Sequence, residues 1–168
     1  MKTICFANIL LLFICSYATA SQIGFRDMII GMDRVELIVK SAEKLVECRG
    51  DVCEYSSSVK GSPVSVNCYI KDEKLFFIRV EFDPSNYKEI KSAMKEKWGE
   101  PKSITKDKLT NLFGVSVASE NLLWLPPDGV VMMSQYGDLT KGVVTIGGQD
   151  FLSTFNSYRA EKKSGGGF

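Results

Sequence analysis

Histidine is absent from the entire chain. Without it, the Ser-His-Asp and Cys-His arrangements of nucleophilic catalysis are excluded, as are zinc sites with a histidine ligand. The side chain that most often acts as a general base near neutral pH is missing too. Paired carboxylates of the glycosidase kind remain open, because the two acids need not be neighbours in the sequence. We therefore expect a protein that is not an enzyme and that holds no cofactor and no metal.

Excess charge is also lacking, with 21 Lys and Arg against 20 Asp and Glu. A nucleic-acid binder normally carries a basic surplus, and so does a protein held on a membrane surface by a polybasic segment. After the first 20 residues the chain has no apolar run of the length, about 20 residues, that a membrane-spanning helix needs. We expect no nucleic-acid partner and no membrane span.

The first 20 residues have the pattern of a secretory signal peptide. Lys2 supplies the positive start, and residues 4–15 are almost unbroken apolar. Ala18 and Ala20 place small residues where cleavage before Ser21 requires them. The pattern predicts an exported protein that is periplasmic or extracellular.

Three cysteines remain after such cleavage, at Cys48, Cys53 and Cys68. Export permits disulfides, but an odd number allows at most one internal bridge. We favour Cys48–Cys53, which leaves Cys68 as a buried free thiol. The Cys53–Cys68 and Cys48–Cys68 bridges remain open alternatives.

An Arg-Gly-Asp triplet, Arg49-Gly50-Asp51, lies between the first two of these cysteines. We interpret Gly50 as the left-handed residue that ends a helix, and Arg49 as a cation that suits the C-terminal end of the helix dipole. The alternative is an adhesion loop formed by Arg49, Gly50 and Asp51. A bridge between the flanking cysteines would preorganise such a loop.

Apolar spacing and turn residues predict the elements of the first half. A helix is expected from about Asp33 to about Cys48, with Asp33 as its N-cap. A hairpin follows whose two-residue turn is Lys60-Gly61, a register that places Cys53 opposite Cys68. A third strand is expected over residues 75–82.

In the second half, Asp83-Pro84 begins a helix that Gly99 ends. Expected strands cover residues 111–118, 122–125, 130–136 and 142–147, and a last helical segment begins at Asp150.

This order of elements predicts an α+β fold. It consists of tandem helix-plus-antiparallel-strand units (α-βββ-α-βββ), with the helices packed on one face of an antiparallel sheet. We expect a single domain over residues 21–160, made of two similar units at about 21–82 and 83–158. A flexible tail is expected over residues 161–168.

The hairpin around Pro126-Pro127-Asp128-Gly129 is apolar on both faces. An antiparallel strand with one face in water should alternate instead. Either the hairpin is central and covered on both sides, or it exposes a partner-binding patch of the residue types enriched at interfaces. The candidates for that patch are Leu122, Trp124, Val131 and Met133.

The run Ile30-Gly31-Met32-Asp33, followed by a helix pattern, resembles the opening of small bacterial envelope domains. These are the SmpA/OmlA-like family and the family of the β-lactamase inhibitor protein. The resemblance covers residues 24–82. The chain departs from the pattern at Asp33, where threonine is usual, and it lacks the lipid-attachment motif. The resemblance implies a non-enzymatic, protein-binding role.

We therefore predict an exported, non-enzymatic protein-binding module that acts as an inhibitor, chaperone or envelope-assembly accessory. Its expected partner is another envelope or secreted protein. Two alternatives remain: a small-ligand or lipid-binding protein whose apolar hairpin lines a groove, and the adhesion loop.

Overall fold

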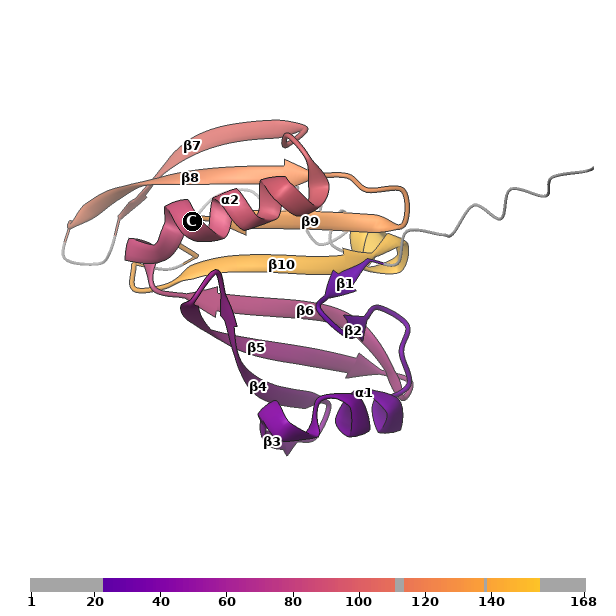
Figure 1. Cartoon of the computed structure of the whole chain (residues 1–168). Helices are drawn as coiled ribbons and strands as arrows, with labels where there is room; N and C mark the ends of the chain where they lie inside the picture. Colours follow the sequence, from indigo (N-terminus) through magenta and orange to yellow (C-terminus); the bar gives the residue numbers. More distant parts are fainter. Residues whose placement is uncertain (1–22, 111–113, 138, 155–168) are drawn as a thin grey trace, which may run out of the picture.

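A computed structural model describes residues 23–110, 114–137 and 139–154 of the chain. Its main element is one antiparallel sheet of eight strands in the order β3-β4-β5-β6-β10-β9-β8-β7 (Figure 1). The strands are β3 (Leu45–Arg49), β4 (Val52–Val59), β5 (Ser62–Lys71), β6 (Lys74–Phe82), β7 (Ser103–Thr110), β8 (Ser116–Trp124), β9 (Gly129–Ser134) and β10 (Gly142–Gly148).

Short elements complete the described part of the chain. They are the two-stranded hairpin β1 (Gly24–Phe25) and β2 (Met28–Ile29), the helices α1 (Arg34–Lys40) and α2 (Tyr87–Trp98), and the 3-10 turns η1 (Ala42–Lys44) and η2 (Pro84–Asn86). Residues 149–154 are also helical. The expected signal peptide and the expected tail lie outside the described residues.

The expected α+β fold of tandem helix-plus-strand units is wrong. Among the described residues 52% lie in strands and 24% are helical, and the eight strands form one large antiparallel sheet with few helices. Part of the difference lies in the first helix, which ends at Lys40 instead of near Cys48. Residues 45–49 form strand β3 and pair with β4. A short apolar run fits a helix or a strand equally well, so pairing with a neighbour decides its structure.

Strand β7 is a second element that the sequence pattern missed. Seven of its eight residues are exposed, and only Leu109 is half-buried. It lies at the edge of the sheet, beside β8 alone. The strands expected at 111–118 and 122–125 are in fact largely one strand, β8. Without a buried face, β7 has no alternation of apolar and polar residues by which a strand is detected.

The register expected from the Lys60-Gly61 turn is confirmed. Cys53 pairs with Cys68 across β4 and β5, and Lys60 and Gly61 form the turn with φ angles of 49° and 85°. Trp124 pairs with Val131 across β8 and β9. Positive φ at both central residues is the pattern of a type I′ turn, whose twist matches that of the strands.

Helix α2 covers one face of the sheet. Asp83 caps the η2 turn that leads into it, accepting a hydrogen bond of 2.8 Å from the Ser85 amide. Figure 1 shows α2, the β1–β2 hairpin and α1 on the same side of the sheet. The α2 residues that face it are Tyr87, Ile90 and Met94, all buried. The buried side chains of the sheet on this face include Tyr55, Val66, Cys68, Ile78, Val80, Leu122, Trp124, Val131, Met133, Val144 and Ile146.

The turn between β5 and β6 offers a test of the backbone geometry. Asp72 and Glu73 both have positive φ, at 51° and 59°. A left-handed backbone conformation costs a non-glycine residue about 1–2 kcal/mol. Glycine avoids this cost, but part of the gain is lost because glycine has more conformational entropy in the unfolded chain. We expect Glu73→Gly to raise the free energy of unfolding by about 0.5 kcal/mol, measured by urea denaturation with an unchanged m value.

Glu43→Gly is the matched control for that substitution. Glu43 is also an exposed acid, but it lies in η1 and is not among the residues with positive φ. We expect Glu43→Gly to lower the free energy of unfolding. A loss of stability in both variants would contradict the assigned turn.

Candidate functional site

The Arg-Gly-Asp triplet lies at the tip of the β3–β4 hairpin. Arg49 pairs with Val52, so Gly50 and Asp51 form a two-residue turn. Gly50 has a φ of 55°, while Asp51 is not among the residues with positive φ. This is the pattern of a type II′ hairpin turn, with glycine at its first central position. The expectation of a left-handed Gly50 is therefore confirmed, but Gly50 closes a hairpin and does not end a helix.

A disulfide bridge closes the hairpin behind this turn. Cys48 and Cys53 are directly paired across β3 and β4, and they form the bridge that the sequence favoured. Cys68 is the free, buried cysteine of the described residues. Because the bridge spans only a few residues, it constrains the tip locally.

Helix α1 and strand β5 hold the tip from two further sides. Arg34 donates a hydrogen bond of 2.9 Å from Nη2 to the carbonyl oxygen of Gly50. The amide of Ile70 donates one of 2.7 Å to the carbonyl oxygen of Asp51. The Nη1 atom of Arg34 is also 3.8 Å from Glu73 Oε1. The backbone of the tip is thus fixed before any partner arrives.

The two charged side chains of the triplet project into solvent. Those of Arg49 and Asp51 are 82% and 80% exposed. Arg49 Nη2 is 2.9 Å from Glu47 Oε1, and Asp51 Oδ1 is 4.0 Å from Arg34 Nη1. Exposed ion pairs of this kind contribute about 0–1 kcal/mol, so both side chains can exchange these contacts for those of a partner.

Three exposed valines lie at the same end of the molecule. Val35 and Val39, one helical turn apart on α1, are 72% and 70% exposed, and Val46 on β3 is 60% exposed. Figure 1 shows α1 and β3 together at the lower end of the sheet. We call Val35, Val39, Val46, Arg49 and Asp51 the α1–β3 surface.

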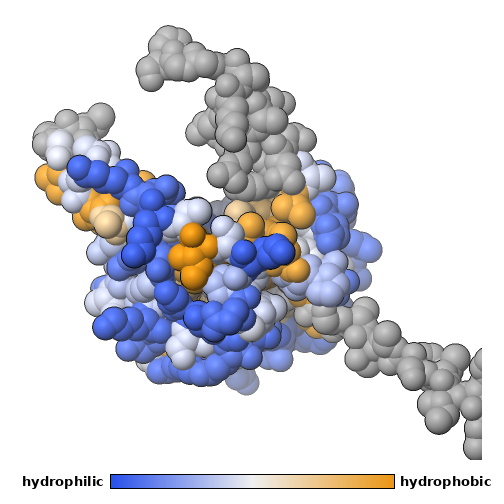
Figure 2. Space-filling view, turned by 90° about the horizontal axis from the view of Figure 1, so that it is seen from above, coloured by the Kyte–Doolittle hydropathy of each residue, from blue (hydrophilic) through white to orange (hydrophobic). Residues whose placement is uncertain are grey.

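The opposite edge of the sheet has a different character. Figure 2 looks down on this edge and shows a largely hydrophilic surface with small, separate apolar patches. Ile104 is the exposed large apolar side chain of β7, and Lys106 and Lys108 are exposed beside it. Lysines on an edge strand discourage the addition of another strand.

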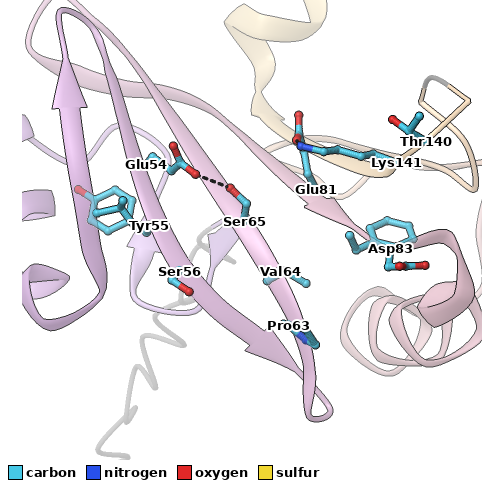
Figure 3. Close-up of a pocket in the computed structure, with 12 residues that line it drawn as sticks. Glu54, Tyr55, Ser56, Pro63, Val64, Ser65, Glu81, Asp83, Thr140 and Lys141 are labelled. Carbon is cyan, nitrogen blue, oxygen red and sulfur yellow. Dashed lines mark hydrogen bonds and ion pairs between the residues drawn. The ribbon is translucent and has the colours of Figure 1, made fainter.

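A cavity of about 510 Å³ lies over β4, β5 and β6 (Figure 3). Ser65 donates a hydrogen bond of 3.1 Å to Glu54 and is paired opposite Glu81. Burial pushes the pKa of Glu81 upward, but hydrogen bonds from Lys141 and Arg79 outweigh it and leave the pKa below its usual value. A general acid needs a raised pKa. Glu81 is therefore suited to a fixed ionic cluster and not to proton donation.

A second cavity, of about 630 Å³, contains both tryptophans of the chain, Trp98 and Trp124. Lys97 lines it as well, donating a hydrogen bond of 2.7 Å to the carbonyl oxygen of Gly24 and lying 4.7 Å from the centre of the Trp98 ring. Desolvation by burial lowers the pKa of Lys97. Lys102 adds a second cation to the lining. Glu100 also lines it and is paired with Lys95 at 2.7 Å. The cavity thus combines aromatic walls with two cations and one paired acid.

The predicted partner-binding patch on the second hairpin lies in the core. Leu122, Trp124, Val131 and Met133 are each at most 2% exposed. They face α2, and the indole nitrogen of Trp124 donates a hydrogen bond of 2.9 Å to the carbonyl oxygen of Gly99 at the end of that helix. The sequence left open whether this hairpin is covered on both sides or exposes a partner-binding patch. The placement of these four side chains fits the covered hairpin. The apolar stripe of α2 was the signal that this face would be covered.

No group of three His, Cys, Asp or Glu side chains in the described ranges is placed to hold a metal ion. Within the same ranges, no helix has the length and apolar character needed to cross a membrane.

The two methionines of β9 test the assignment of this hairpin to the core. Met133 faces α2 and is 1% exposed, whereas its neighbour Met132 is half-buried on the other face. We expect Met133→Ala to lower the free energy of unfolding by about 2–5 kcal/mol, measured by urea denaturation, because it leaves a cavity in the core. The matched control Met132→Ala should lower the free energy of unfolding by a smaller amount. Equal losses would contradict the assignment.

A comparison of the chain with models of protein families, with curated proteins and with solved structures finds no match.

Proposed function

We propose that this is an exported, non-enzymatic module that binds another envelope or secreted protein through its α1–β3 surface. The observation that carries the proposal is the hairpin tip, where Arg49 and Asp51 are exposed on a turn that a disulfide closes. A disulfide also suits an oxidising compartment, as expected for an exported protein.

Preorganisation is the physical advantage of such a tip. A flexible loop loses conformational freedom when it binds, and that loss opposes association. Here the bridge, the Arg34 hydrogen bond and the pairing with β5 fix the backbone in advance. Binding then has to order only the side chains of Arg49 and Asp51.

The chemistry of the surface defines the partner. Asp51 requires a cationic group or a bound cation opposite it, and Arg49 requires a carboxylate. Val35 and Val39 on α1 and Val46 on β3 are exposed apolar side chains at the same end of the molecule. A partner with an acid and a cation about one hairpin width apart, surrounded by apolar surface, is complementary. Inhibition, chaperoning and envelope assembly are the roles that such a contact serves.

Adhesion is the most specific form of the same proposal. An integrin-type receptor would read Arg49-Gly50-Asp51 by the position of its two charges. Asp51→Glu keeps the negative charge but moves the carboxylate by one methylene. It therefore tests whether the position of the carboxylate matters in addition to its charge. Loss of cell attachment in both Asp51→Ala and Asp51→Glu supports adhesion, and unchanged attachment in Asp51→Ala rejects it.

The proposal predicts the outcome of a cross-linked co-purification from the source of the protein. The double variant Arg49→Ala, Asp51→Ala should lose a partner that the wild type retains, because both charged contacts are removed. Lys88→Ala, Glu89→Ala is the matched control, since it also removes one exposed cation and one exposed anion, but from α2. A partner retained by both variants would contradict binding through the hairpin tip.

The cavity beside Trp98 and Trp124 supports a second candidate function, the binding of a small amphipathic ligand. Its aromatic walls suit an acyl chain, while Lys97 and Lys102 suit a carboxylate. Of the four candidate side chains of the second hairpin only Trp124 lines the cavity, and the turn residues Leu125, Pro126 and Pro127 that follow it line it as well.

Intrinsic fluorescence tests this candidate directly, because the only two tryptophans both line the cavity. Titration with dodecanoate should shift the emission and saturate. Lys97→Ala should weaken binding about tenfold, the effect of losing one charge-assisted hydrogen bond of about 1.5 kcal/mol. Lys88→Ala, outside the cavity, should leave the curve unchanged. A change that does not saturate would reject the site.

A further inference from the structure

Three cysteines stand in register on three adjacent strands. Cys48 on β3 is paired with Cys53 on β4, and Cys53 is in turn paired with Cys68 on β5. Directly paired residues of an antiparallel sheet point to the same face. The three side chains therefore follow one another on one face of the sheet, with the disulfide between the first two and the free cysteine on the next strand.

Backbone geometry allows Cys53 to be bridged to either neighbour. The Cα atoms of Cys48 and Cys53 are 4.1 Å apart, the short separation of a non-hydrogen-bonded pair. The N–H and C=O groups of a strand residue point toward the same neighbouring strand. Those of Cys53 do not point toward Cys48, so they point toward β5, and Cys53 and Cys68 form a hydrogen-bonded pair. The Cα atoms of such a pair are about 5.5 Å apart, which lies inside the range that a disulfide accepts.

We propose that these residues form an exchange relay that moves the disulfide from Cys48–Cys53 to Cys53–Cys68 and releases Cys48 as a thiol. Cys68 first loses its proton, and its thiolate attacks the sulfur of Cys53. The new sulfur–sulfur bond forms as the old one breaks, and Cys48 leaves as a thiolate that takes up a proton. One disulfide and one thiol are present before and after, so the step needs no oxidant or reductant.

The thiol that is free differs in reactivity before and after the exchange, because Cys68 and Cys48 lie in different surroundings. Cys68 is fully buried, with its sulfur 3.5 Å from that of Met28, and burial raises its pKa to about 12. The titratable group that faces it is Tyr55 on β4, whose pKa burial and the nearby Cys68 raise to about 12. Because only the thiolate reacts, the exchange is slow near neutral pH and faster as the pH rises.

Exchange changes which thiol is available. Cys48 is only half-buried and lies on β3, an edge strand with a single neighbour. Released there, it becomes a site for mixed disulfides with small thiols or with a cysteine of another protein. The hairpin tip loses its closing bond at the same time. The exchange itself does not depend on the proposed function of that tip.

Thiol mapping tests the relay in the wild-type protein, recovered from the exported fraction. The protein is incubated at pH 7, 8 and 9, labelled in short pulses with N-ethylmaleimide, quenched in acid and mapped by peptide mass spectrometry. We expect label at Cys48 that grows with time, at a rate that rises about tenfold per pH unit because the thiolate fraction does. A second sample is unfolded after the incubation so that every free thiol is labelled. If Cys68 alone carries label in that sample at every pH, the relay is overturned.

Two variants make the result independent of labelling rates. Cys68→Ser removes the attacking thiol, so Cys48 should stay unlabelled; label there in this variant would overturn the mechanism. Cys48→Ser should be recovered with a Cys53–Cys68 bridge and no thiol that reacts under denaturing conditions. A folded Cys48→Ser protein with two free thiols would overturn the alternative bridge. If this variant fails to fold, the wild-type map decides.

Discussion

Strand β6 pairs along Phe77–Phe82 with β10, which comes last of the eight strands in chain order. It does not pair with β7, the strand that follows it in the sequence. This pairing joins two runs of antiparallel strands into one continuous sheet, with β3 and β7 as its two edges. The chain between β6 and β7 is then free to cross the sheet as α2. Its apolar stripe of Tyr87, Ile90 and Met94 buries the face beneath it. The positions of the core, the cavities and the hairpin tip all depend on this arrangement.

Local chemistry was predictable, and long-range pairing was not. The turn at Lys60-Gly61 sets the register that places Cys53 opposite Cys68. Asp83 caps the η2 turn that leads into α2, and Gly99 ends that helix. These signals lie within a few residues of what they determine. The strand identity of residues 45–49 depends instead on β4, and the exposed strand β7 has no apolar pattern at all.

The same division applies to the candidate site. The bridge between Cys48 and Cys53 could be favoured from the sequence because the two are close in the chain. The exposure of Arg49 and Asp51 could not, because it follows from β3 being an edge strand. Burial of Trp124 and Met133 likewise depends on where α2 packs. An apolar hairpin alone does not specify whether its cover is a helix of its own chain or a partner.

The disulfide contributes to the site more than to the fold. Closing a short loop removes less entropy from the unfolded chain than closing a long one. The bridge spans a separation of 5 residues, so its effect is concentrated at the tip. Stability of the sheet rests on burial beneath α2, and the geometry of the tip can therefore change without loss of the core.

The pairing of β6 with β10 also has a consequence for the order of folding. A chain that emerges N-terminus first presents β3 to β6 before β10 exists. Until β10 arrives, β6 has an unpaired edge, and the buried face that includes Ile78 and Val80 is uncovered. Contacts between segments so distant in sequence slow folding and prolong exposure to aggregation. The nascent half-sheet therefore exposes both an unpaired strand and an apolar face until β10 has been made.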